Sequence, residues 1–193
     1  LFAAAILKES LTVDKRRSSK EKAPSRWTAF AGASKYLYVL SFFVSFTLAG
    51  LEATLQYYQM DKIGATPFDI GMMFLASGIV GALIQGGVVR RLVKQGAEQF
   101  VIGIGLFLSA AGFFLLLYSS SVVTAAIYLS VFGAGNALIR PCVTSLITQR
   151  TKVGQGVATG LSSSMDSLGR IAGPLLGGAV FAIAHSLPFI IGG

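Results

Sequence analysis

Charged and amide side chains interrupt several long apolar stretches of this sequence. The most prominent are Glu52, Asn136, Arg140, Asp166 and Arg170. Such groups are costly inside a membrane, so they normally face a bundle interior or a water-filled cavity and mark the path of a substrate or a proton. These residue types therefore suggest ligand binding and proton exchange.

Helical spacing arranges these residues into polar stripes, one on each of three apolar stretches. The stripes are Ser45, Ala49, Glu52 and Gln56; Ser130, Gly133, Asn136, Arg140 and Thr144; and Thr159, Ser163, Asp166 and Arg170. They suit either a shared cavity or hydrogen bonds between helices. We favour helix packing for the serines and threonines. For Glu52 we favour a functional role, because no basic residue lies near it in its own stretch.

The composition is that of a membrane protein. Hydrophobic residues make up 53% of the 193 residues and charged residues only 12%, and 23 glycines are scattered through the apolar stretches. A spanning helix needs about 20 mainly apolar residues. Five segments meet that length: Tyr36–Tyr58, Phe68–Val89, Phe100–Tyr118, Val122–Thr148 and Val157–Ala184. The predicted fold is an all-α, polytopic membrane helix bundle.

The two ends of the sequence resemble pieces of further spans. Leu1–Leu7 and Pro188–Gly193 are short apolar fragments, and a polar, basic stretch follows the first of them. We therefore expect residues 1–35 to be the end of a preceding span with a cytoplasmic linker. Residues 36–193 are expected to form a transmembrane helical half-domain with a truncated last span.

The net charge of +8 is distributed unevenly among the connections between spans. Basic residues gather before the first span and in alternate connections, whereas the intervening connections hold only Lys62. The basic positions in those alternate connections are Arg90, Arg91, Lys94, Arg150 and Lys152. This pattern predicts that the basic loops are cytoplasmic. It does not favour nucleic-acid binding, which needs a continuous basic face with aromatic residues placed to stack on bases.

Enzyme chemistry finds little support in the sequence. His185 has no second histidine or cysteine beside it for a metal site, and we interpret it as an interface residue. Cys142 is the single cysteine and is interpreted as packing. There is no phosphate-binding glycine loop followed by Lys-Ser/Thr. We expect neither an enzyme nor a bound cofactor or metal.

The depth of the charges in the membrane suggests possible partners. At a rise of about 1.5 Å per residue, Arg140 and Asp166 should both lie roughly 12–14 Å from the cytoplasmic boundary. This predicts an ion pair between them. Glu52 and Arg170 lie about 20–24 Å in by the same count, and Arg170 is also one turn from Asp166. The sequence alone leaves these pairings open.

Glycine and proline residues favour close helix contacts and bends. The last span contains Gly169, Gly173 and Gly177 at four-residue spacing, with Pro174 between them. Small residues at this spacing let helices approach closely, and proline removes a backbone hydrogen bond. Pro141 follows Arg140 directly and predicts another bend.

These motifs resemble those of the Major Facilitator Superfamily, in particular its drug:proton antiporter branch. The run from Gly169 to Gly178 resembles the G-x-x-x-G-P-x-x-G-G antiporter signature, placed here in the second half of such a transporter. The segment from Gly86 to Lys94 resembles the G-x-x-x-D-R-x-G-R-K loop, with Gly86, Arg91 and Lys94 matching. Arg90 and Val93 depart from that loop's acidic residue and second glycine.

The resemblance extends over nearly the whole chain, with the five spans as helices seven to eleven. Glu52 resembles in position a carboxylate that serves proton coupling or cation binding in several multidrug exporters. Asn136-Ala-Leu-Ile precedes Arg140-Pro141 where some of them have a second acid. The matches imply helix packing and gating roles for Gly86, Arg91, Lys94, Gly169, Gly173, Pro174 and Gly177.

The function that the resemblance implies is export of small amphiphilic compounds by alternating access, in exchange for protons. The proton gradient would be the energy source, and the N-terminal half of the same transporter would be the partner in the plasma membrane. Glu52, Gln56, Asn136, Arg140, Asp166 and Arg170 are the expected pathway residues. The alternatives are a carrier of one metabolite, such as a sugar, siderophore or organic acid, and a non-transporting membrane scaffold.

Overall fold

The computed structural model describes residues 34–89, 91, 96–151 and 154–193. The described residues form helices and turns without any strand, which confirms the all-α class. The helices are α3 (Ser34–Ile63), α4 (Pro67–Leu83), the π-helix η2 (Ile84–Val89), α6 (Glu98–Leu116), α7 (Val122–Arg150), α8 (Gln155–Ile183) and α9 (Leu187–Gly192). The predicted preceding span and nearly all of the predicted linker, residues 1–33, lie outside the described residues.

Four of the described helical segments are long and apolar enough to cross a membrane. They are Ser34–Ile63, Pro67–Val89, Glu98–Leu116 and Val122–Arg150. The fifth predicted span forms the 29-residue helix α8, at almost the predicted bounds. It is not among those four, and one of its faces carries Ser163, Asp166 and Arg170.

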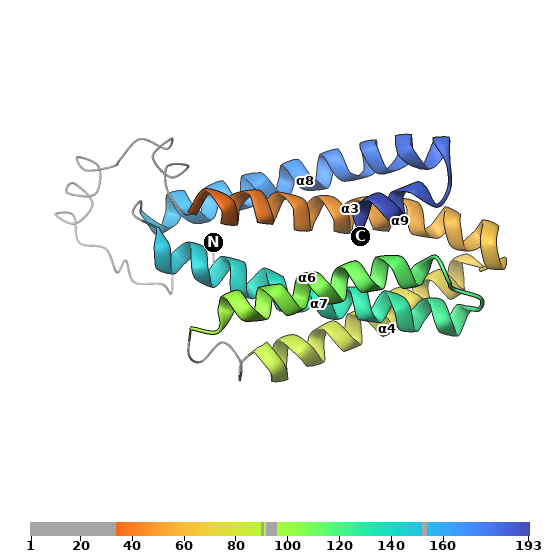
Figure 1. Cartoon of the computed structure of the whole chain (residues 1–193), viewed down its shortest axis with the longest axis horizontal. Coiled ribbons are helices and arrows are strands. Elements are labelled where there is room, and N and C mark those ends of the chain that lie inside the picture. The colour runs from red at the N-terminus through yellow and green to blue at the C-terminus, as the bar shows by residue number, and fades with distance from the viewer. Residues whose placement is uncertain (1–33, 90, 92–95, 152–153) are drawn as a thin grey trace, which may run out of the picture.

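Successive long helices run in opposite directions along the bundle (Figure 1). The α4–α6 and α7–α8 connections lie at one end, which we call the basic end because it carries Arg91 and Arg150. The α3–α4, α6–α7 and α8–α9 turns lie at the other end. Two of these turns lead into helices with reciprocal side-chain caps, at Thr66 for α4 and Ser121 for α7. The caps satisfy the first free backbone N–H groups and fix where each helix begins.

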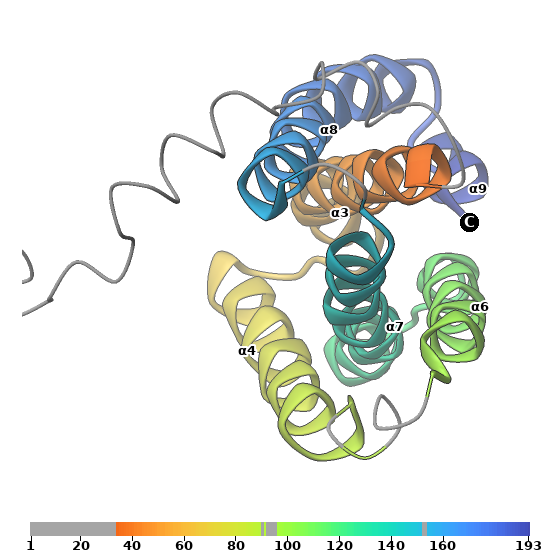
Figure 2. The same cartoon turned by 90° about the vertical axis from the view of Figure 1, so that its left-hand side faces the viewer.

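The helices form two groups that meet along α3 and α7 (Figure 2). One group holds α3, α8 and α9, and the other holds α4, α6 and α7. Buried apolar side chains form two clusters, one towards each end of the bundle. The cluster towards the basic end includes the free, buried Cys142 of α7. The other cluster brings together aromatic rings from three helices: Phe113 contacts Phe132 edge to face and Phe189 at a tilted angle.

Glycines bring α3 and α8 into backbone contact, as the spacing in the last span predicts. A Cβ atom built on Gly169 would lie 2.5 Å from the carbonyl oxygen of Phe42, and one on Gly173 would lie 2.9 Å from the backbone nitrogen of Gly50. A Cβ on Gly177 would lie 3.3 Å from the Cα of Gly50. Side chains at Gly169 and Gly173 would therefore force the two helices apart.

Both predicted proline positions lie inside helices that continue past them. Pro174 is within α8 and exposed, and Pro141 is within α7. A helical proline leaves the carbonyl oxygen four residues earlier without its usual N–H donor. That free carbonyl belongs to Arg170 in α8 and to Ala137 in α7.

Candidate functional site

A buried serine joins two of the predicted charged residues. Ser45 of α3 has no exposed surface, and its hydroxyl donates to Oδ1 of Asp166 on α8 over 2.9 Å. The same hydroxyl oxygen accepts a hydrogen bond of 3.1 Å from Nη2 of Arg140 on α7. Three helices from both groups of the bundle therefore meet at one hydroxyl group.

The direct ion pair predicted between Arg140 and Asp166 is not formed. Both residues are described, and no contact between them meets salt-bridge distance. Matched depth was the basis of the prediction, but α3 lies between α7 and α8 (Figure 2). The Ser45 hydroxyl therefore takes the place of a direct contact between the guanidinium and the carboxylate.

Two neighbouring cavities open on either side of Arg140. The first, of about 570 Å³, is lined by Asp166, Arg140 and Gln85, and we call it the Asp166 cavity. The second, of about 380 Å³, is lined by Glu52, Asn136, Arg140 and Gln85, and we call it the Glu52 cavity. Each carboxylate lines only one of the two cavities, whereas Arg140 lines both.

Glu52 and Gln56 lie on α3 and are exposed in the described structure. Glu52 reaches the cavity that bears its name, and Gln56 lines neither of the two cavities. Arg170 is exposed on α8 and also lines neither. The predicted alternatives in which Arg170 pairs with Glu52 or Asp166 are not formed within the part of the chain that the structure describes.

Asn136 stands where the resemblance leads one to look for a second acid. Its side chain is only 7% exposed, and its amide nitrogen donates to the carbonyl oxygen of Phe132 over 3.3 Å. Its amide oxygen has no hydrogen-bond partner among the described residues. An unpaired buried acceptor is costly, and Asn136 lines both the Glu52 cavity and the apolar cavity described below.

Sequence reasoning missed the contribution of α4 and of η2, which continues it. Gln85 lines both cavities, and Ser77 lines the Glu52 cavity while its hydroxyl donates to the carbonyl oxygen of Leu129 over 3.1 Å. Gln85 lies in the π-helix η2, and single π-helical turns are frequent at functional sites. A polar residue inside an apolar span was the available signal, the same one that identified Glu52.

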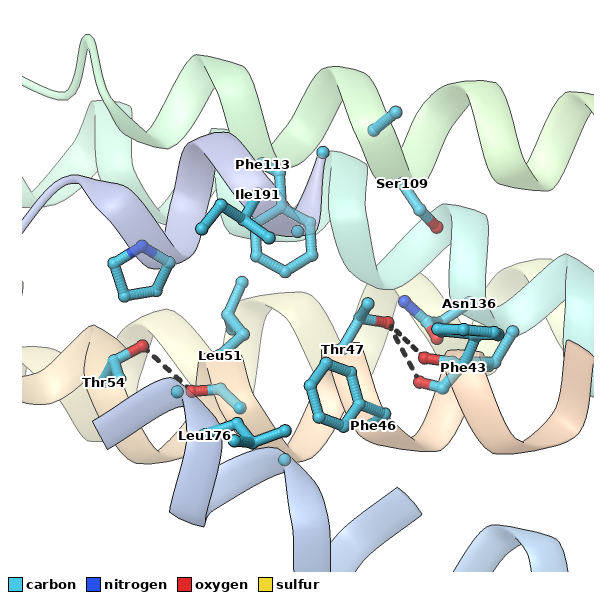
Figure 3. Close-up of a pocket in the computed structure, with 18 of the residues that line it drawn as sticks. Phe43, Phe46, Thr47, Leu51, Thr54, Ser109, Phe113, Asn136, Leu176 and Ile191 are labelled. Carbon is cyan, nitrogen blue, oxygen red and sulfur yellow. Dashed lines mark hydrogen bonds between the residues drawn. The ribbon is translucent and has the colours of Figure 1, made fainter. Parts of the chain in front are cut away.

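A third cavity, of about 470 Å³, differs from these two in chemistry. It lies between α3, α6, α8 and α9, with Asn136 of α7 at its wall, and Figure 3 shows aromatic and aliphatic side chains that include Phe43, Phe46 and Phe113. Its two threonine hydroxyls, of Thr47 and Thr54, donate to carbonyl oxygens of their own helix. No ionisable side chain lines it. The charged residues thus all lie away from this apolar cavity.

Comparison with known proteins identifies the family. The family model described as Major Facilitator Superfamily matches residues 37–193. The chain belongs to this superfamily. Its members are multi-pass membrane transporters and not enzymes, so the environment of this chain is lipid.

The superfamily relatives include bacterial proteins named for drug resistance. Multidrug resistance protein 1 of Bacillus subtilis is 30% identical over 193 residues, which cover 98% of this chain and 50% of the relative. Quinolone resistance protein NorA of Staphylococcus aureus is 30% identical over 150 residues, covering 78% and 39%. The chain spans about half the length of the Bacillus relative and 39% of the length of NorA.

A solved structure of the superfamily shares the fold. The human organic anion transporter MFSD10 (TETRAN) superposes with a TM-score of 0.72 at 24% sequence identity. The match covers 99% of this chain and 42% of that protein. At this identity the likeness supports the helix arrangement alone.

The loop that resembles a superfamily motif is described only in part. Arg91 is exposed at the basic end, and Lys94 lies outside the described residues. Gly86 is in η2, and no atom would lie within 4 Å of a Cβ built on it. No contact inside the described structure therefore requires a glycine at position 86, and its predicted packing role stays a prediction.

Proposed function

We propose that the complete protein exports small amphiphilic compounds, cations among them, in exchange for protons. Glu52 carries this proposal, because it is an acid on a membrane-spanning helix that faces a cavity it shares with Asn136 and Arg140. The names of the bacterial relatives, which refer to multidrug and quinolone resistance, support the substrate class. This chain would be the C-terminal half of the transporter.

Glu52 suits such an exchange because a carboxyl group can carry either a cation or a proton. In its ionised form it attracts a cationic compound, and in its protonated form it no longer does. If the cavity opens alternately to the two sides of the membrane, one group then couples the two fluxes. Glu52 is exposed in the described structure, which supports a cavity that an N-terminal half would complete.

The proposed orientation puts the basic end in the cytoplasm of a plasma-membrane protein. Arg91 and Arg150 lie at the same end of the bundle, while Lys62 lies at the opposite end (Figure 1). This distribution agrees with the positive-inside rule. Residues 1–35 would then connect this half to the preceding one on the cytoplasmic side.

A carrier of a polar metabolite is less well supported by the Asp166 cavity. Two of its hydroxyls belong to Thr144 and Thr148, and each donates to a carbonyl oxygen of its own helix, over 3.1 Å in both cases. Their hydrogens are therefore already engaged, and a sugar-like solute would have to compete for them. A non-transporting scaffold would have no use for a carboxylate exposed on a membrane span.

The test is export by the Glu52→Gln variant, expressed from the complete gene in cells that lack their own drug exporters. Accumulation of a cationic dye and of a neutral compound is measured with and without a proton uncoupler. The variant should reach the membrane in normal amounts and lose proton-driven export of the cation, with the neutral compound less affected. Asp61→Asn, which alters an exposed acid on the same helix outside both charged cavities, is the matched control.

Two results would contradict the coupling role. Unimpaired, still pH-dependent export of the cation by folded Glu52→Gln protein would exclude it. Poor folding with loss of all compounds alike would show instead that Glu52 serves only to hold helices together.

A further inference from the structure

We infer that Arg140 is a counter-ion shared by two carboxylates, held on the Asp166 side by Ser45 and transferred to Glu52 when Asp166 loses its charge. The inference rests on the proposed function, because it assigns a control of the same cavity. Its starting point is the Ser45 hydroxyl, which accepts from Arg140 and donates to Asp166.

The position of Arg140 gives it access to both acids. It lines the Asp166 cavity and the Glu52 cavity, and each of these cavities contains one carboxylate. The amide groups of Gln85 in η2 and of Asn136 on α7 also line these cavities, and both are neutral. Arg170 is the remaining described charge of the polar stripes, and it lines neither cavity. The Arg140 guanidinium can therefore pair with either of the two carboxylates.

Helix geometry favours the transfer. Side chains lean towards the N-terminus of their own helix. Arg140 therefore leans towards Asn136, one turn earlier on α7, whose buried amide oxygen has no partner. Glu52 leans towards Ser45, which is two turns earlier on α3. The Glu52 cavity thus holds an ionic partner and an unfilled acceptor for the guanidinium.

The Ser45 bridge makes the position of Arg140 depend on the charge of Asp166. The serine hydrogen points to Asp166, which orients the oxygen lone pairs towards Arg140. When a proton neutralises Asp166, both the attraction across the bridge and the preferred orientation of the hydroxyl are weakened. Arg140 then pairs with the carboxylate that is still ionised, and Glu52 becomes less available to a cationic compound. Ser45 acts as a positioning residue in this sequence.

The test measures the reactivity of Glu52 without requiring transport. The complete protein, purified in detergent, is treated with a hydrophobic carbodiimide, and modification of Glu52 is quantified by peptide mass spectrometry. Asp166→Asn mimics the neutral acid and should lower Glu52 modification several-fold, because an ion-paired carboxylate reacts poorly. Ser45→Ala should lower it in the same direction. Adding Arg140→Gln to Asp166→Asn should abolish the protection.

Ser162→Ala is the matched control. Ser162 is a buried serine of the same α3–α8 interface, bonded to Ser41 over 3.3 Å, and it lines neither charged cavity. Its loss should leave Glu52 modification unchanged. Unaltered Glu52 modification in folded Asp166→Asn or Ser45→Ala protein would overturn the inference, as would protection that persists without Arg140. If the labelling pattern holds while Glu52→Gln protein still exports cations, the proposed function fails and the shared counter-ion stands.

Discussion

The α3–α8 and α6–α7 interfaces both contain glycines that let the helix backbones touch, but they differ in the polar side chains between the helices. In the first, Gly169 and Gly173 lie against α3. In the second, a Cβ built on Gly112 would lie 2.6 Å from the backbone nitrogen of Phe132, and one on Gly105 would lie 2.9 Å from the carbonyl oxygen of Gly135. Small residues therefore allow close backbone approach in both groups of helices.

The difference lies in the polar contacts within each interface. The α3–α8 interface contains the Ser41–Ser162 and Ser45–Asp166 hydrogen bonds within the span. The α6–α7 interface is apolar over most of its length and has its charged contact at the basic end, where Nε2 of Gln149 donates to Glu98 over 3.0 Å. Glycine contacts thus indicate how closely the helices pack, whereas buried polar contacts indicate which interface holds a charged side chain within the span.

The largest expected effect comes from adding one methyl group at the closest backbone contacts. Gly173→Ala and Gly112→Ala should each destabilise the protein by roughly 1–3 kcal/mol or prevent its folding, because the opposing atoms belong to backbone that cannot easily move. The measurement is thermal unfolding in detergent. Gly178→Ala and Gly103→Ala are the controls, since nothing lies within 4 Å of a Cβ at either position. Equal melting temperatures for Gly173→Ala and Gly178→Ala would refute the close contact.

A double-mutant cycle tests whether the Ser45 bridge couples Arg140 of α7 to Asp166 of α8. Arg140→Ala and Asp166→Ala should each impair folding or export, because each leaves an unbalanced charge beside Ser45. The double variant should cost less than the sum of the two, by about 0.5–3 kcal/mol in thermal or denaturant unfolding. Strict additivity would mean that the Ser45 bridge does not couple the two residues.

A smaller effect is expected at the basic end of the α6–α7 interface. Glu98 is only 3% exposed, and Gln149 donates both to it and to Oγ of Ser145. Glu98→Ala should lower the melting temperature by a few degrees, because it leaves the amide of Gln149 with one acceptor fewer. Gln155→Ala, at the exposed start of α8, should leave it unchanged. Export of compounds should survive in the folded Glu98→Ala protein, which separates this contact from the charged cavities.

The smallest effect is expected at the end opposite the basic end. Nδ1 of His185 lies 3.1 Å from Oδ2 of Asp61, with side chains that are 57% and 67% exposed. Exposed pairs of this kind contribute about 0–1 kcal/mol. His185→Ala should therefore change the melting temperature by less than Gly173→Ala or Glu98→Ala. A decrease in melting temperature as large as theirs would show that the His185–Asp61 pair is a main contact between α3 and the end of α8.

The sequence predicted the helices well because apolar length determines them. The predicted span Val122–Thr148 is the helix Val122–Arg150, and Phe100–Tyr118 is the helix Glu98–Leu116. The first span was predicted to end at Tyr58, whereas α3 continues to Ile63. Gln59 is fully buried there, and the carbonyl oxygen of Leu117 accepts a hydrogen bond from Lys62. These tertiary contacts extend the helix beyond its apolar run.

The arrangement of the candidate site was harder to predict. Residue counting gives the depth of Arg140 and Asp166 along the bundle axis, but it does not tell which helix lies between them. Ser45 appeared in a predicted stripe, yet only the packing of α3 between α7 and α8 shows that its hydroxyl joins the two charges. The π-helix around Gln85 was also missed, since a shift in backbone hydrogen bonding leaves little trace in composition.

The backbone contact between α3 and α8 also limits how this protein can change during evolution. Any mutation at Gly169 or Gly173 adds mass where none fits, so variants selected on new compounds should keep glycine at both positions. The walls of the charged cavities have no such constraint at Gln85 and Thr144, which are exposed. If the protein is selected for export of a wider range of compounds, the mutations should therefore fall on the cavity walls and not at the glycine contacts between α3 and α8.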